Sequence, residues 1–288
     1  MAHCLAKLIC FLAFSGVTAG AASPYLGFDR NDYPGDAALP ALRRTFRYTG
    51  YWLNNPPGDT RNTWTGKRSI LKKHGFGFLV LFTGRTDAQL KPEDAADLGA
   101  QDGRAAVDAA LHEGFAPGVL IFLDQEEGGR MLREQAAYVL AWIGAVQAAG
   151  ARAGVYCSGI PVPDGTQTIT TAQDIIERLS SAPQISTKSK SAEGRVALWI
   201  AQDQCPPSPG CTVAAPPLAA VGTLAPSAPA FIAAWQYAQS PRRAQFSASC
   251  PRNQASDGNC YAPGLPHDAN TFIDLDVTNS PDPSEAPR

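Results

Sequence analysis

The feature that most constrains the fold is a regular alternation of short apolar runs with segments of helical periodicity. Eight apolar runs of strand length occur, at Tyr25–Asp29, Phe46–Trp52, Gly77–Phe82, Gly118–Asp124, Ala153–Cys157, Val196–Ala201, Phe231–Gln236 and Phe272–Val277. Helical patterns lie between them, at Ala37–Arg44, Thr65–His74, Ala100–Glu113, Arg130–Ala149 and Thr171–Ser180. Eight strands interleaved with helices predict an α/β fold of the (β/α)8 TIM-barrel type.

Glycines at the predicted helix ends support a barrel, whereas a proline-rich stretch indicates that the barrel is irregular in the last third of the chain. Gly75, Gly114 and Gly150 follow three of the helical patterns, where a left-handed residue ends a helix. An open doubly wound sheet is the alternative, but no Gly-x-Gly-x-x-Gly follows the first strand. The stretch Gln202–Pro229 is rich in proline, so we expect a loop in place of one helix. Residues 24–278 therefore form one barrel domain, and 279–288 form a disordered, solvated tail.

The N-terminal residues have the pattern of a secretory signal peptide. Lys7 supplies a positive charge, Leu8–Phe14 is apolar, and Ala19–Ala21 is a small-residue cleavage site. A membrane anchor is the alternative, but the apolar run is too short to span a bilayer. We therefore expect residues 1–21 to be removed and the protein to be secreted or periplasmic.

The charge balance excludes some classes of partner. The chain of 288 residues has 24 Lys and Arg against 26 Asp and Glu, a net charge of −2, and no basic run. A nucleic-acid backbone is therefore not an expected partner. We expect a monomer without a membrane span.

The cysteines suggest an oxidising compartment. Two of the seven fall in the signal segment, and four bracket two loops in pairs, Cys205 with Cys211 and Cys250 with Cys260. Their spacings are not those of a Cys-x-x-Cys metal site, so two local disulfides are the preferred interpretation. Cys157 is left over, and we expect a buried free thiol there.

Carboxylates gather at the ends of three predicted strands. Alternate residues of a strand face opposite sides. Asp124 and Glu126 therefore share one face, and Asp274 and Asp276 share another. Asp29 likewise opposes the apolar face of its own strand. If these faces point to the barrel axis, acids of the first, fourth and eighth strands meet where barrel enzymes carry out chemistry.

Three interpretations of these acids remain open. Carboxylates crowded into a partly dry site raise at least one pKa, and an acid pair of unequal pKa is what glycosidic bond cleavage needs. The same oxygens would also suit a hard cation. Simple solvation of strand ends is the third interpretation.

Aromatic residues favour a sugar ligand among these interpretations. The alternation that turns Leu198 and Ile200 outward sends Trp199 to the inside, and Tyr156 faces inward on the preceding strand. Rings at the edge of a site stack on the C–H faces of sugars. Core packing is the alternative for each ring taken singly.

Six short motifs occur in the order of the barrel strands: Gly27–Asp29, Asp124–Glu126, Val155–Tyr156, Leu198–Ala201, Trp235–Tyr237 and Ile273–Asp276. In this the chain resembles the glycoside hydrolase-like barrels grouped as domain of unknown function 1906. That group is similar to the glycoside hydrolase family 25 lysozymes, which cleave the muramic acid–glucosamine linkage of peptidoglycan. The resemblance covers about residues 24 to 278.

The resemblance implies a role for each acid. Glu126 would be the general acid. Asp124 would stabilise the charge that develops on the sugar or position the reacting group. Asp29 and Asp274 would complete an acidic floor, and Glu127 would face away from the axis by alternation. The implied sugar contacts, with further candidates last, are Tyr156, Trp199, Gln236, Asp276 and Tyr237.

The resemblance implies a secreted enzyme that cleaves a β-glycosidic bond in peptidoglycan or a related polysaccharide, with no cofactor and no metal. The two glycines after Glu127 and the Cys205–Cys211 loop differ from a typical muramidase. A glycan-binding barrel without catalytic activity is therefore the alternative function.

Overall fold

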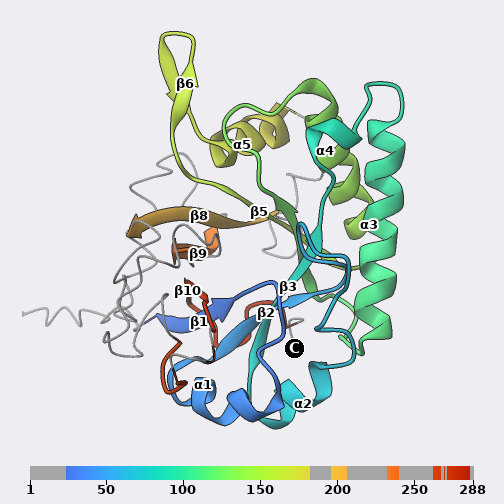
Figure 1. Cartoon of the computed structure of the whole chain (residues 1–288). Helices are drawn as coiled ribbons and strands as arrows, with labels where there is room; N and C mark the ends of the chain where they lie inside the picture. Colours follow the sequence, from blue (N-terminus) through green and yellow to red (C-terminus); the bar gives the residue numbers. More distant parts are fainter. Residues whose placement is uncertain are drawn as a thin grey trace, which may run out of the picture.

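The computed structural model describes residues 24–181, 196–205, 232–239, 262–266, 269 and 271–285. These residues form a closed barrel of eight strands in the order β1-β10-β9-β8-β5-β4-β3-β2 (Figure 1). The barrel strands are β1 Tyr25–Asp29, β2 Tyr48–Trp52, β3 Gly77–Thr83, β4 Leu120–Gln125, β5 Arg152–Ser158, β8 Ala197–Cys205, β9 Ile232–Ala238 and β10 Asp274–Thr278. Each overlaps one predicted strand, so the predicted α/β barrel is confirmed.

The barrel is mixed, because β10 runs antiparallel to both of its neighbours, β1 and β9. All the other neighbouring barrel strands are parallel to one another. The eighth strand therefore differs from the regular (β/α)8 pattern. An antiparallel strand needs no crossover connection before it, whereas a parallel strand does.

Helices follow the strands in the first two thirds of the chain. They are η1 Asp36–Ala38, α1 Leu39–Thr45, α2 Arg68–Lys73, η2 Asp87–Gln89, α3 Ala95–His112, α4 Arg133–Ala148 and α5 Thr171–Ser181. All five predicted helices are present. Gly75, Gly114 and Gly150 have φ values of 85°, 81° and 81°, as expected for residues that end helices. A hairpin that we did not predict, β6 Val162–Asp164 with β7 Gln167–Ile169, projects from the rest of the molecule (Figure 1).

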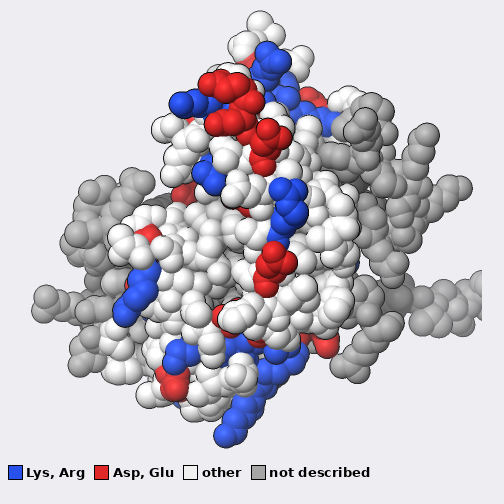
Figure 2. Space-filling model, turned by 90° about the vertical axis from the view of Figure 1, so that its right-hand side faces the viewer, with Lys and Arg blue, Asp and Glu red and all other residues white. Residues whose placement is uncertain are grey.

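The longest helices, α3 and α4, pack closely through glycine. A Cβ at Gly99 would lie 2.2 Å from the carbonyl oxygen of Tyr138, and one at Gly103 would lie 2.7 Å from that of Trp142. The two backbones can approach this closely only because α3 has no side chain at these positions. On the α3 side of the molecule, acidic and basic side chains are interspersed (Figure 2).

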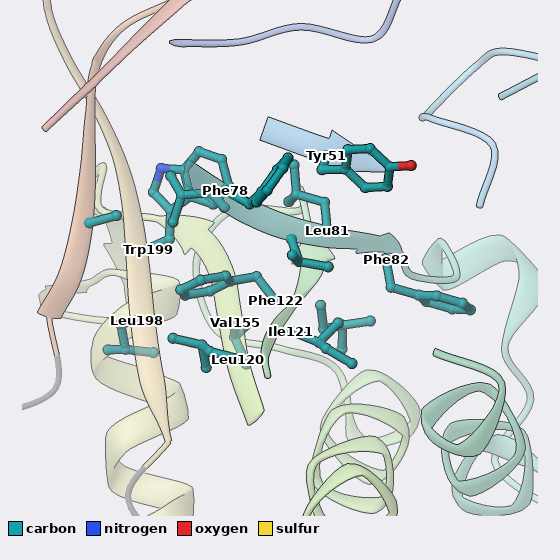
Figure 3. Close-up of a cluster of buried hydrophobic side chains, with 14 of the residues drawn as sticks. Tyr51, Phe78, Leu81, Phe82, Leu120, Ile121, Phe122, Val155, Leu198 and Trp199 are labelled. Carbon is teal, nitrogen blue, oxygen red and sulfur yellow. The ribbon is translucent and has the colours of Figure 1, made fainter. Parts of the chain in front are cut away.

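Large side chains fill the barrel interior. Leu81 and Phe122 are register partners on β3 and β4, and the ring centroids of Phe122 and Trp199 lie 5.7 Å apart (Figure 3). Gly154 leaves room for Phe122, since a Cβ there would lie 2.5 Å from the ring. Leu120, two residues before Phe122 on β4, is also buried.

The residues after β10 are not a solvated tail. The side chain of Asp282 accepts a hydrogen bond from Phe78 N at 2.9 Å, and Ser284 Oγ accepts one from Val80 N at 3.0 Å. The Ser284 carbonyl also accepts a hydrogen bond from Leu120 N at 3.0 Å. This segment therefore satisfies N–H groups near the starts of β3 and β4, and Ser284 is only 1% exposed. The predicted disordered tail is wrong for residues 279–285.

Several predictions lie outside the described residues. They are the signal peptide, the loop between β8 and β9, and the two disulfides, whose cysteines 211, 250 and 260 are not described. Cys157 is a buried free thiol, as predicted, and burial raises the pKa of its thiol to about 12. No helix in the described part of the chain has the length and apolar character needed to cross a membrane.

Candidate active site at the mouth of the barrel

Acids from three strands meet at one end of the barrel. This end, which we call the mouth, is where β1 and β4 finish and β10 begins. Asp29 and Asp274 are direct partners across the β1–β10 pair, so their predicted proximity is confirmed. Asp124 lies beside Tyr156 across β4 and β5. We call Asp29, Asp124, Glu126 and Asp274 the mouth acids.

The direction of β10 corrects the predicted position of its acids. Asp274 starts the strand rather than ending it, and reaches the mouth because β10 is antiparallel. Asp276 lies two residues deeper, opposite Gly27, and is fully buried. Its Oδ1 accepts a hydrogen bond from Trp199 Nε1 at 3.0 Å. The structure therefore places Asp276 in the interior, below the mouth.

Gln236 connects three of the predicted site residues. Its Nε2 donates to Asp29 Oδ2 at 2.8 Å and approaches Asp274 Oδ2 at 3.5 Å. Its Oε1 accepts a hydrogen bond from the Tyr156 hydroxyl at 2.8 Å. The amide orientation is fixed, because its nitrogen faces carboxylates and its oxygen faces a hydroxyl donor.

Tyr156 lies among the mouth acids and against an aromatic ring. Its ring centroid is 5.0 Å from that of Trp199, at an interplanar angle of 75°. Burial raises the pKa of the Tyr156 hydroxyl well above its ordinary value, and the negative charges of the mouth acids raise it further. The hydroxyl therefore stays protonated and acts as a hydrogen-bond donor.

The mouth acids differ in exposure. Asp29, Asp124 and Asp274 are 4%, 5% and 4% exposed, whereas Glu126, one residue beyond the end of β4, is exposed. Glu126 is therefore the mouth acid most accessible to a large ligand.

Glu127 faces away from the mouth, as alternation predicts. Its carboxylate accepts hydrogen bonds from Asp87 N at 3.0 Å and from the side-chain amide of Gln125. It therefore joins the end of β4 to η2. Gly129 has a φ of 87°, and a Cβ there would lie 2.4 Å from Val162 of the hairpin. The glycine that departs from a typical muramidase is thus required by the path of this loop.

A buried carboxylate that the sequence analysis missed holds the same loop. Asp174 on α5 accepts hydrogen bonds from Met131 N at 3.0 Å, from Arg130 at 2.9 Å and from Arg178 at 2.8 Å. Arg130 also pairs with Asp164 of the hairpin at 2.8 Å. Asp174 is 44 residues from Arg130 along the chain, so no local pattern could have revealed the contact.

Two glycines on β1 and β2 make room for the site. A Cβ at Gly50 would lie 2.6 Å from the Cβ of Asp29, and one at Gly27 would lie 1.9 Å from the ring of Tyr48. The Gly-x-Asp spacing of the first strand was visible in the sequence, but the role of Gly50 depends on the register between β1 and β2.

Tyr237 is not joined to this network among the described residues. It lies where the β9–β10 register shifts, with its ring centroid 6.2 Å from that of Trp235. Its hydroxyl is buried and has no hydrogen-bond partner in the described part of the chain. The described residues also contain no group of three or more His, Cys, Asp or Glu side chains placed to hold a metal ion.

The sequence matches one protein family over more than half of its length. Residues 46–202 match the model of the Rv2525c-like, glycoside hydrolase-like domain. The chain belongs to this family. The resemblance to glycoside hydrolase-like barrels is therefore confirmed. The match includes Asp124, Glu126, Tyr156 and Trp199, whereas the strands that carry the other site residues lie outside it.

Several solved structures are similar to this chain over most of its length. An uncharacterized protein from B. stearothermophilus has 18% identity and a TM-score of 0.56, over 88% of this chain and 95% of its own. The Tat-secreted Mycobacterium tuberculosis protein Rv2525c, in complex with L-tartrate, has 11% identity and a TM-score of 0.51, over 90% and 97%. A family 25 glycosyl hydrolase from Bacillus anthracis has 11% identity and a TM-score of 0.45, over 89% of each chain. A search of curated proteins gives no match.

Proposed function

We propose that this protein is a secreted glycoside hydrolase that cleaves a β-glycosidic bond in peptidoglycan or a related polysaccharide. The observation that carries the proposal is the arrangement of the mouth acids around Tyr156, with Glu126 exposed and Asp124 buried on the same strand end. Membership of a glycoside hydrolase-like family supports the same class of substrate.

In the proposed reaction, Glu126 donates its proton to the leaving glycosidic oxygen while the bond from that oxygen to the anomeric carbon breaks. Water then adds to the anomeric carbon, and its proton passes to a carboxylate of the mouth. Asp124 and Asp29 stabilise the positive charge that develops on the sugar. Like charges held close in partly dry surroundings favour a protonated acid beside ionised partners, which this reaction requires.

The test is digestion of purified peptidoglycan, with new reducing ends counted and fragments identified by mass spectrometry. Glu126→Gln keeps the shape of the side chain but cannot donate an acidic proton, so we expect a rate loss of about 100-fold or more. Glu93→Gln is the matched control, because Glu93 is exposed, precedes α3 and is not one of the mouth acids. Digestion by Glu126→Gln at the wild-type rate would contradict the role of Glu126.

A glycan-binding barrel without turnover is the second candidate. The observation that favours it is the burial of Asp29, Asp124 and Asp274, because a hydrolase needs an acidic partner for Glu126 within reach of the substrate. Co-sedimentation with peptidoglycan, without any release of reducing ends by the wild-type protein, would establish this candidate and exclude the hydrolase.

A further inference from the structure

Asp276 lies deeper in the barrel than the mouth acids, and it reaches neither the mouth nor the protein surface. It is 0% exposed, and its Oδ1 accepts the hydrogen bond from Trp199 Nε1. Its Oδ2 receives no hydrogen bond from any donor in the described part of the chain. A buried carboxylate oxygen without a donor is costly, whereas a carboxylic O–H in the same place can itself be the donor.

The neighbour that can accept such a proton is Asp29. Asp276 faces Gly27 across the β1–β10 pair, and Asp29 lies two residues further along the same face of β1. Gly27 has no side chain to separate them. A hydrogen bond between the two carboxyl groups requires a proton on one of them, because two carboxylates have only acceptors.

The surroundings of Asp276 favour its neutral form. The titratable groups that face it are Asp29 on β1, Tyr48 on β2, Tyr237 on β9 and Asp274 on its own strand. None of these four adds a positive charge. Burial, followed by the charges of Asp29 and Asp274, raises the pKa of Asp276 well above its ordinary value.

We propose that Asp276 is a positioning residue, whose neutral carboxyl group donates a hydrogen bond to Asp29 and holds Asp29 as the acceptor for Gln236. The donors then run in a consistent order. Trp199 donates to Asp276 and Asp276 donates to Asp29. From the other side Tyr156 donates to Gln236, which donates to Asp29. Asp29 is the acceptor at which both series end.

This arrangement gives Asp29 two directed donors at the floor of the mouth. Its carboxylate is thereby fixed as a hydrogen-bond acceptor, while Asp276 keeps its proton and takes no part in turnover. The effect on catalysis rests on the proposed function, but the protonation of Asp276 does not.

Infrared spectroscopy tests the protonation without any substrate. We expect the difference spectrum of wild type minus Asp276→Asn at pH 7 to show the carbonyl stretch of a buried protonated carboxyl group, because the contribution of Glu126 is present in both proteins and cancels. Asp108→Asn is the matched control, because Asp108 is exposed on α3, and it should retain the band. Absence of the band from this difference spectrum would overturn the proposal.

Kinetics test the positioning role. The amide of Asp276→Asn can still accept from Trp199 and donate to Asp29, so we expect kcat within about threefold of wild type. Asp276→Leu has no donor, and the loss of one hydrogen bond to a charged group should lower kcat by about tenfold or more and shift the acidic limb of the pH profile. A pH profile unchanged in Asp276→Leu, or equal loss in both variants, would overturn the proposal.

The two tests separate the two proposals. A wild-type protein without hydrolase activity would contradict the proposed function, and the infrared band would still decide the state of Asp276. If Asp276→Leu fails to fold, the band and the comparison of Asp276→Asn with wild type still decide the proposal.

Discussion

The acids Asp124, Glu126 and Glu127 have different surroundings because β4 ends at Gln125, between the first and the second of them. Asp124 is still part of β4 and turns into the barrel beside Tyr156. Glu126 follows the strand and is exposed, while Glu127 turns back to the backbone of Asp87. A shift of the strand end by one residue would exchange the two glutamates. The loop contacts that fix this end are therefore as important to the site as the acids themselves.

At the scale of one residue, Asp276 predicts a particular dependence of stability on pH. A carboxyl group whose pKa is raised by folding stabilises the folded state below its unfolded pKa of about 4. That contribution is lost as the pH rises toward the higher folded pKa of Asp276. The unfolding free energy of the wild type relative to Asp276→Asn should therefore fall from pH 4 upward, by at most about 1.4 kcal/mol per pH unit.

Urea unfolding of both proteins at several values between pH 4 and pH 8 measures this difference, with Asp108→Asn as the control. A difference that does not change with pH would mean that folding leaves the pKa of Asp276 at its ordinary value.

At the scale of elements, the packing of α3 on α4 sets how closely the helices cover the barrel. Replacing Gly99 by Ala puts a Cβ against the fixed carbonyl of Tyr138, so the helices must separate. We expect the unfolding free energy to fall by about 1–3 kcal/mol.

Gly144→Ala on α4 is the matched control, because a Cβ there meets nothing within 4 Å. It should raise the unfolding free energy by about 0.5–1 kcal/mol, since glycine is unfavourable within a helix. Chemical denaturation measures the unfolding free energy of both variants. An equal change in the two would show that α3 and α4 have room for a Cβ at Gly99.

The sequence was sufficient to predict the eight barrel strands and the five helices, but not the hairpin or the direction of β10. Alternation placed Asp274 and Asp276 on one face correctly, but a strand has the same alternation whether it runs parallel or antiparallel to its neighbours. The depth of Asp276 depends on that direction and so could not be predicted. The role of Gly129 and the contacts of Asp174 depend on the hairpin and on α5, which the fold brings to the loop from 30 or more residues away.

At the scale of the whole molecule, the barrel is closed at its base by residues beyond the last strand. Deleting residues 281–288 removes the acceptors for the N–H groups of Phe78, Val80 and Leu120. An unpaired buried N–H costs about 1–3 kcal/mol, so we expect the unfolding free energy to fall by at least about 3 kcal/mol.

Deletion of residues 286–288 alone leaves these three hydrogen bonds in place and is the control. Urea denaturation of the two truncated proteins makes the comparison. Equal midpoints would show that the segment contributes nothing to the stability of the barrel.

The antiparallel course of β10 also decides where the chain can be extended. Tyr25 at the start of β1 lies beside Thr278 at the end of β10, so the barrel domain begins and ends at the pole opposite the mouth. A tether, a tag or a second domain joined before Tyr25 or after Glu285 would attach on the side of that pole, would keep the contacts of Asp282 and Ser284, and would leave the access of a long polymer to the mouth unobstructed. For immobilisation on a support or for fusion to another protein, both ends of the barrel domain are thus suitable points of attachment.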